Sequence, residues 1–348
     1  MKNFILFILV FMCWNTSFSQ VVDLTHLDQQ AQLADPMAFC NAINAALEAF
    51  QEVDENGNPT GEYSFPNNSI CFIMHDYDSP ESRKWQYFYT LRCRIKIREG
   101  QTLNIPTGMV IELEDGGGFD LSGNGSIVGD NYARSKITND GIGPAITMGG
   151  HGPDADKCQG CHVSDISIEG KGDPLRADGI TITEGSEMND VSSVRFAGLE
   201  NGIRVEGNCN TFSDLSFFQV AIDRDDCIAT WDDPTAVLIY AAHQNTFTNI
   251  NHTRSIGAIS VKLELVSTNN RVLNLAVEQE DSPCSDPAIY VTRGSQSIWN
   301  YFVTNFNGAT YKIAQAEATF KEKNILLPWV NPSTLNLSAC NAPICNLE

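Results

Sequence analysis

The segments Gly179-Ile-Thr-Ile-Thr183 and Gly202-Ile-Arg-Val-Glu206 share one form, a small residue followed by alternating apolar and polar side chains. Three further copies follow: Ala236-Val-Leu-Ile-Tyr240, Ala258-Ile-Ser-Val-Lys262 and Ala288-Ile-Tyr-Val-Thr292. Alternation with a period of two is typical of a β-strand with one buried face. The copies begin 23, 34, 22 and 30 residues apart, which indicates a repeated unit that carries loops of different length.

A second type of strand follows each of these copies, and together the two types predict the fold. The second type occupies residues 191–196, 212–217, 247–252, 272–277 and 298–303. Stacked copies lie about 4.8 Å apart, so their inward apolar side chains form one continuous core. We therefore expect an all-β protein, a right-handed parallel β-helix (a solenoid) of about eight turns over residues 105–325. One interior column should contain Ile180, Ile203, Ile239 or Val237, Ile259 and Ile289.

The corners and ends of this repeat also leave sequence signals. Glycine and asparagine tolerate a positive φ, and we expect them to use it at the corners. These residues are Gly185, Gly207, Asn189, Asn210 and Asn270. The segment 35–50 has apolar residues at helical spacing and is expected to form an N-terminal capping helix, because a parallel stack must protect its open ends. The segment from Leu326, with Cys340 and Cys345, is expected to form a disulfide-stapled C-terminal cap.

The N-terminus has the pattern of an export signal. Lys2 precedes the apolar run 4–14, and Ser17 and Ser19 occupy the small-residue positions before a cleavage site. We therefore expect residues 1–19 to be a signal peptide, 20–104 an N-terminal cap region, 105–325 the β-helix and 326–348 the C-terminal cap. A secreted or periplasmic location follows, without membrane insertion, and we expect a monomer.

The charge balance limits the partners of the chain. Its formal net charge is −21, from 22 Lys and Arg residues against 43 Asp and Glu residues. Such an acidic chain argues against nucleic acid as a partner, because phosphate groups are attracted by excess positive charge. An anionic substrate would have to bind at a locally basic site or through a bridging cation.

The repeat resembles the pectate-lyase-like β-helix superfamily over about residues 95–325. Gly100-Gln-Thr-Leu-Asn-Ile-Pro-Thr-Gly108 and Ile127-Val-Gly-Asp130 look like the opening turns of that group. The superfamily contains lyases, hydrolases, epimerases and binding proteins, so the resemblance implies the fold and leaves the chemistry open.

Outward positions of the first strand type give candidate site residues. Aligning the copies at their small residues puts Arg204 and Tyr290 in one outward column. Glu206, Tyr240 and Lys262 then fall in the next column, which places Arg204, Tyr240 and Lys262 on three successive turns of one face. Two cations and a phenol on one face of so acidic a chain suggest a binding site for an acidic sugar. The alternative is a solvated ladder in which Glu206 pairs with the cations.

These residue types suit β-elimination from a uronic acid. Arg204 would neutralise the substrate carboxylate as charge develops beside it. Lys262 or Tyr240 would act as acid or base. His243 at a turn, or His151 in the Gly-rich loop 149–156, would supply a further base. Glu206, Arg254 and Tyr290 would bind substrate, whereas His252 aligns with inward positions and is expected to be a core residue.

Acidic loops offer a candidate metal site. Asp223, Asp225 and Asp226 are oxygen donors of the kind that Ca²⁺ prefers, although their spacing matches no defined calcium loop and plain solvated charge is the alternative. No cofactor is required by the expected chemistry, and calcium is an optional addition. Asp225 and Asp226 also resemble the paired aspartates of polygalacturonase-type hydrolases, but the rest of that motif is missing, and Asp178 lies two turns away.

Three functions remain open at this stage. The first is an exported carbon–oxygen lyase that acts on a uronic-acid-containing poly- or oligosaccharide, either a polysaccharide lyase or a chain-end dehydratase. The second is a glycoside hydrolase that pairs Asp225 or Asp226 with Asp178 or Glu206. The third is a glycan-binding surface protein without catalysis.

The cysteines provide a first prediction. Removal of Cys13 with the signal leaves ten, an even number that in an exported chain points to disulfides. Most of the ten should be paired, with Cys340 bonded to Cys345 or to the last turns, and Cys158 and Cys161 forming a disulfide or remaining as thiols rather than binding zinc. Alkylation with and without reduction, read by mass spectrometry, checks this. Ten alkylatable thiols in the unreduced protein would contradict it.

Overall fold

The computed structural model describes the central part of the chain and separate strands on either side. The described residues are 21–23, 41, 44–45, 68–71, 87–105, 107–114, 116–150, 156–170, 177–218, 235–254, 259–279, 287–291, 300–307, 312–315 and 325–328. They form an all-β structure of parallel strands in two stacked sheets, as expected from the repeat. No described helix is long and apolar enough to cross a membrane.

One sheet has nine strands, and neighbours in it come from successive passes of the chain. Its strands are β4 (Arg94–Ile97), β7 (Gly118–Leu121), β10 (Gly143–Met148), β13 (Ala177–Ile182), β16 (Asn201–Val205), β18 (Thr235–Tyr240), β20 (Ile259–Glu264), β22 (Pro287–Val291) and β24 (Lys312–Gln315). Between these strands the chain crosses to the other sheet, so each pass contributes to both. Strands of both sheets begin upstream of residue 105.

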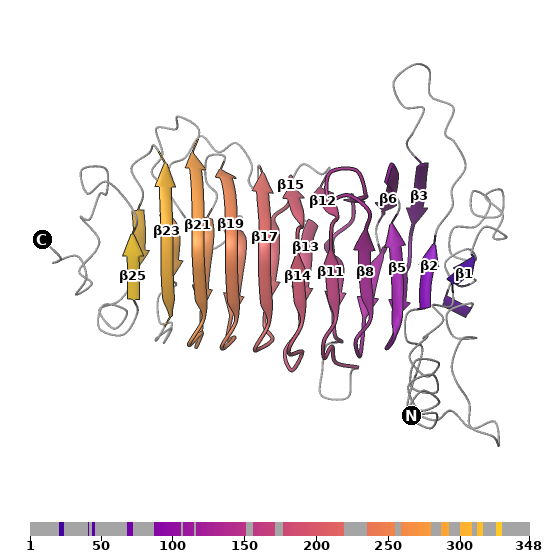
Figure 1. Cartoon of the computed structure of the whole chain (residues 1–348), viewed down its shortest axis with the longest axis horizontal. Coiled ribbons are helices and arrows are strands. Elements are labelled where there is room, and N and C mark those ends of the chain that lie inside the picture. Colours follow the sequence, from indigo (N-terminus) through magenta and orange to yellow (C-terminus); the bar gives the residue numbers. More distant parts are fainter. Residues whose placement is uncertain are drawn as a thin grey trace, which may run out of the picture.

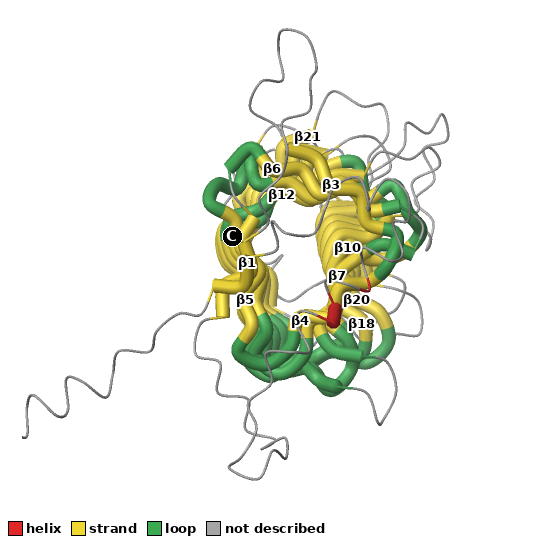
Figure 2. The backbone as a smooth tube through the Cα atoms, turned by 90° about the vertical axis from the view of Figure 1, so that its right-hand side faces the viewer, coloured by secondary structure: helices red, strands yellow, loops and turns green. Residues whose placement is uncertain are grey.

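The second sheet has sixteen strands: two rows, β1-β2-β5-β8-β11-β14 and β3-β6-β9-β12-β15, meet at β17, and a single row continues from there along the long axis of the molecule (Figure 1). Its early strands are β1 (Val21–Asp23), β2 (Asn68–Cys71), β3 (Tyr87–Leu91), β5 (Gln101–Ile105), β6 (Met109–Leu113), β8 (Ser126–Gly129), β9 (Lys136–Asn139), β11 (His162–Ser164), β12 (Ser167–Gly170), β14 (Asp190–Ser192) and β15 (Arg195–Ala197). Its later strands are β17 (Thr211–Phe218), β19 (Thr246–Arg254), β21 (Arg271–Gln279), β23 (Tyr301–Asn307) and β25 (Ile325–Pro328). Viewed along the long axis, β7, β10, β18 and β20 lie opposite β1 and β5 (Figure 2).

The core consists of columns of apolar side chains, one per pass. Ile180, Ile203, Val237, Val261 and Ile289 are consecutive partners across five strands of the nine-stranded sheet. Four of them were expected in this column, but Ile259 was not the fifth, because it pairs with Thr235. A second column stacks the rings of Phe196 and Phe217, with centroids 4.8 Å apart.

His252 continues this aromatic column, which confirms that it is a core residue. Its ring packs edge-on against Phe217, and the residue is 0 % exposed. Its Nδ1 lies 2.8 Å from the hydroxyl oxygen of Ser260, which is also buried. The pair satisfies two polar groups that would be costly to bury apart from each other.

A ladder of buried asparagines runs along one corner of the stack. Its members are Asn189, Asn210, Asn245, Asn270 and Asn300. In each of the first four, the backbone N–H and the side-chain amide both donate to the Oδ1 of the next asparagine, at 2.9–3.1 Å. One oxygen thus links each pass to its neighbour twice.

The ladder corrects the expected role of the corner asparagines. Asn189, Asn210 and Asn270 do not have positive φ values. The residue before each of four ladder asparagines, Asn189, Asn210, Asn245 and Asn270, does, at 57–59° for Met188, Cys209, Gln244 and Asn269. This bend lets the next side chain point inward and form the ladder, so the asparagines are present for their amide groups.

A disulfide takes over where the ladder ends. Cys158 and Cys161 are bonded to each other, and both are 0 % exposed. The N–H of Cys161 donates to the Oδ1 of Asn189 at 2.9 Å, the contact that a further asparagine would make. Cys93 is also disulfide-bonded, and Cys209 is an exposed free thiol. Cys340 and Cys345, with the expected C-terminal cap, lie outside the described residues, as does the expected signal peptide.

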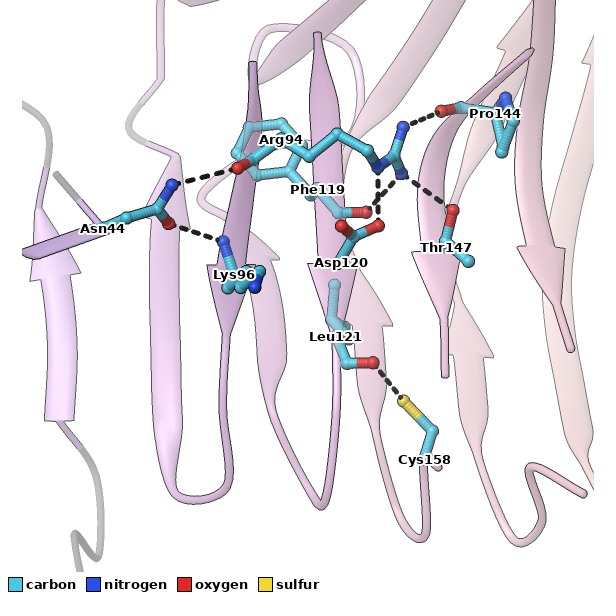
Figure 3. Close-up of polar contacts among 9 residues, drawn as sticks. All are labelled: Asn44, Arg94, Lys96, Phe119, Asp120, Leu121, Pro144, Thr147 and Cys158. Carbon is cyan, nitrogen blue, oxygen red and sulfur yellow. Dashed lines mark hydrogen bonds and ion pairs between the residues drawn. The ribbon is translucent and has the colours of Figure 1, made fainter. Parts of the chain in front are cut away.

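The edge of the nine-stranded sheet at β4 is covered by a side chain. Asn41, Asn44 and Ala45 are helical and lie within the segment expected to form the capping helix. The Nδ2 of Asn44 donates to the carbonyl of Arg94, and its Oδ1 accepts from the N–H of Lys96 (Figure 3). This amide occupies backbone groups that an additional strand would otherwise use.

The ladder gives a prediction for stability. Asn245→Ala removes an amide that bonds the passes on both sides and the carbonyl of Gly207. Because buried partners are left unsatisfied, we expect a loss of about 2–4 kcal/mol in the free energy of unfolding. Asn251→Ala, at an exposed position of β19, the strand that directly follows Asn245, is the matched control and should stay within about 0.5 kcal/mol of wild type. Urea denaturation measures both, and equal losses would contradict a special role for the ladder.

Candidate functional site

The outer face of the nine-stranded sheet carries the candidate site. One outward row runs through consecutive strand partners. It consists of Lys96, Asp120, Thr147, Thr181, Arg204, Leu238, Lys262 and Tyr290. Arg204 and Lys262 are therefore in the same row, with Leu238 between them.

This register differs by two residues from the one expected for β20. Tyr240 is the partner of Glu264, not of Lys262. A shift of two residues keeps every inward residue inward, so alternation alone does not reveal it. The physical reason is Ser260: its small side chain, rather than that of Ala258, takes the interior position where its hydroxyl bonds His252. Arg204, Tyr240 and Lys262 still belong to three neighbouring strands of one sheet, as expected.

Arg204 has one occupied and one open side. Its Nε and Nη2 both lie 2.7 Å from Oε1 of Glu206, two residues further along the chain. Its guanidinium carbon lies 4.9 Å from the ring centroid of Tyr240, within the range of a cation–π contact. Among the described residues nothing hydrogen-bonds to its Nη1, and the side chain is 35 % exposed. An anionic oxygen can therefore reach this guanidinium.

Lys262 is held more tightly. Its side chain is only 5 % exposed, and its Nζ lies 2.7 Å from Oε1 of Glu264. The ion pair occupies the ammonium group and keeps it close to the sheet. The ammonium group of Lys262 is thus shielded from solvent, whereas the guanidinium of Arg204 is the cation that a ligand can contact.

Asp178 completes the site on the strand before Arg204. The residue is the partner of Asn201 across β13 and β16, and Nδ2 of Asn201 donates to its Oδ1 at 2.9 Å. Burial raises the pKa of the Asp178 carboxyl above its ordinary value, while the hydrogen bonds from Asn201 and the charge of Arg204 oppose that shift. A carboxyl whose pKa is raised is a candidate general acid.

Arg94 shows what a structural arginine looks like on the same face. Its Nε bonds Asp120, its Nη1 bonds the carbonyl of Pro144, and its Nη2 bonds the carbonyl of Phe119 and the hydroxyl of Thr147 (Figure 3). All three nitrogens are engaged, and the contacts reach across β4, β7 and β10. Arg94 fastens three strands together and has no nitrogen left for a ligand, in contrast to Arg204.

Of the other expected site residues, His243 is described with its contacts, whereas only the strands of Arg254 and Tyr290 are. The Nδ1 of His243 lies 2.8 Å from the hydroxyl of Thr268, and the N–H of His243 bonds Asn208. These contacts tie His243 to the corner and not to Arg204 or Tyr240. Arg254 and Tyr290 belong to β19 and β22, but their side chains are not described.

The expected metal site cannot be placed. Asp223, Asp225 and Asp226 lie outside the described residues, and so does His151. In the described part of the chain, no group of three or more His, Cys, Asp or Glu side chains is arranged to hold a metal ion. The calcium site stays a prediction.

Asp178 was not among the candidate residues of the strip on this face, but the sequence contains a signal that places it beside Asn201. Asp178-Gly179 and Asn201-Gly202 occupy the same place in two successive copies, a polar residue directly before the small residue. The glycines leave room for rings of the core, since a Cβ on Gly179 would come within 2.8 Å of Phe196 and one on Gly202 within 2.3 Å of Phe217. The polar residues before them therefore recur in register. From the sequence, Asp178 is paired only with Asp225 or Asp226, whereas the structure pairs it with Asn201 on the adjacent strand.

Comparisons with known proteins do not assign a family. No protein family matches the sequence, and no curated protein does. A solved structure described as ORF18 of Geobacillus virus E2 superposes with a TM-score of 0.43 at 12 % identity, over 83 % of this chain. The match spans 57 % of that chain, less than two thirds of its length. A similarity of this size carries no argument about function.

Asp178 gives a prediction with a defined sign. Because its pKa is raised in the folded protein, the folded state loses stability as the pH rises above the ordinary value of 3.8 and this carboxyl ionises. Asp178→Asn removes the ionisation, so its free energy of unfolding should exceed that of wild type near neutral pH, and the difference should vanish in acid. Thermal unfolding at several pH values measures this. Glu184→Gln, at an exposed carboxylate, is the control that should show no such pH-dependent gain.

Proposed function

We propose that the chain is an exported right-handed parallel β-helix of the pectate-lyase-like kind. Alternation of the chain between two parallel sheets, with paired strands one pass apart, supports the helical winding. The N-terminal signal pattern supports export, and the Cys158–Cys161 disulfide suits an oxidising compartment.

Its proposed activity is that of a carbon–oxygen lyase on a uronic-acid-containing poly- or oligosaccharide. The observations that carry the proposal are a partly exposed guanidinium with an open nitrogen on the outer face and, on the adjacent strand, a half-buried carboxyl of raised pKa. A uronate supplies the two matching groups, a carboxylate to be neutralised and a leaving oxygen to be protonated. In a chain of charge −21, the open side of Arg204 is also a place where an anionic sugar can approach.

The residues divide the elimination between them. Arg204 holds the substrate carboxylate, so that negative charge on the adjacent carbon is stabilised as it develops. Tyr240, whose ring contacts Arg204, is the base that removes the proton from that carbon. The electron pair forms the carbon–carbon double bond, the bond to the leaving oxygen breaks, and Asp178 gives that oxygen its proton. Lys262 and Glu264 adjust the charge on the strand beside Tyr240, and Glu206 orients Arg204.

A glycoside hydrolase is the second candidate, and one observation favours it. Arg204 is shared by two carboxyl groups, since it bonds Glu206 directly and its charge acts on Asp178. In that mechanism Asp178 would be the acid and Glu206 the base or nucleophile.

Product analysis separates the candidates. Purified protein is incubated with uronate glycans, and the ultraviolet absorbance of unsaturated products is followed together with reducing ends. Elimination that breaks a sugar linkage produces both signals, and elimination of water at a chain end produces the absorbance alone. Reducing ends without absorbance indicate hydrolysis, and binding without either signal indicates a glycan-binding protein and overturns the enzymatic proposal.

Variants of the site test the assigned roles. Asp178→Asn and Tyr240→Phe should each lower turnover by a factor of roughly 10² or more, the usual contribution of a general acid or base. Arg204→Ala should lower kcat/KM and raise KM, because the carboxylate loses its partner. Lys96→Ala removes an exposed cation from the far end of the same row and is the matched control for charge, with wild-type kinetics expected. Full activity in all three site variants would refute the assignment.

A further inference from the structure

Asn201 holds the carboxyl of Asp178 from the neighbouring strand. Its side-chain Nδ2 donates to Asp178 Oδ1 at 2.9 Å, and its backbone N–H also bonds this carboxyl. Two donors from one residue on a β-strand leave the carboxyl little freedom to rotate. The contact links β13 to β16, the strand that also carries Arg204.

The contact also acts on the charge of Asp178. Donors that point at a carboxylate stabilise its ionised form, whereas burial destabilises it. Both hydrogen bonds from Asn201 lower the pKa of Asp178 against the larger effect of burial, and Arg204 acts in the same sense. A carboxyl without these donors would remain protonated to higher pH and would release its proton less readily.

We propose that Asn201 is a positioning residue, which fixes the orientation of the Asp178 carboxyl and keeps it able to give and regain a proton. The proposal rests on the proposed role of Asp178 as the acid and adds the residue that tunes it. Asn201 does not contact the reacting atoms. It acts through Asp178 alone.

Among the described residues, few other groups lie where they could set the charge of Asp178. On the β10 side its strand partner is Pro144, and from β9 the amide of Asn139 bonds its backbone carbonyl, not its carboxyl. Asp140 and Glu200 are neighbours in sequence of Asn139 and Asn201, and neither contributes to the shift of the Asp178 pKa. Among the described charged groups, Arg204 is the one that does.

The test is the variant Asn201→Ala, with two readouts. Titration of the Asp178 carboxyl by carbon-detected NMR, assigned with Asp178→Asn, should move to higher pH. In the rate profile, the alkaline limb set by the acid should move the same way, so that the rate there, relative to the plateau, rises by a factor of roughly 3 to 10. Asn201→Gln, which keeps an amide, should restore part of the shift.

A structural control separates positioning from general destabilisation. Asn210→Ala removes a buried ladder amide away from Asp178, and it should lower stability while leaving both titrations unchanged. An unchanged NMR titration in Asn201→Ala overturns the positioning role. A shifted NMR titration with an unshifted rate profile instead refutes Asp178 as the acid, which is a failure of the proposed function and not of the contact.

Discussion

The hydrogen bond between successive buried asparagines fixes how each pass of the chain sits on the next. Because one Oδ1 accepts from both the backbone and the side chain of its neighbour, the amides must be aligned to within a single residue. The aromatic column and the apolar columns follow from that alignment. So does the row on the outer face, where Arg204 and Lys262 share a line with Leu238 between them.

The outer face shows how the same residue type can serve either the fold or a site. Arg94 uses every nitrogen on protein oxygens and joins three strands, whereas Arg204 is anchored by one glutamate and lies on a phenol ring with one nitrogen open. Asp178 carries a comparable distinction among the acids, since its carboxyl is partly buried and this burial raises its pKa. Buried ionisable groups reduce stability, and their presence on an outward face is more readily explained by function than by folding.

Alternation in the sequence was sufficient to predict which side chains point inward. It correctly placed Ile180, Ile203 and Ile289 inside and Arg204 and Tyr240 outside. It could not fix the register of β20, because a slip of two residues preserves the alternation, and only the buried pair of Ser260 and His252 selects the correct one. Which charged groups pair along the row depends on that register. The raised pKa of Asp178 depends on burial by the assembled fold, which no local pattern contains.

The candidate site is distributed over consecutive passes, with Asp178, Arg204, Tyr240 and Lys262 each on a different strand. In a stack where each pass contacts only its neighbours, strands can detach from an end without the rest unfolding. Loss of the passes from β20 onward would remove Lys262 and Glu264 from the strand beside Tyr240. The hydrogen bonds among Asn189, Asn210 and Asn245 would remain. The chemistry of the site would therefore change at temperatures where most backbone amides are still protected from hydrogen exchange.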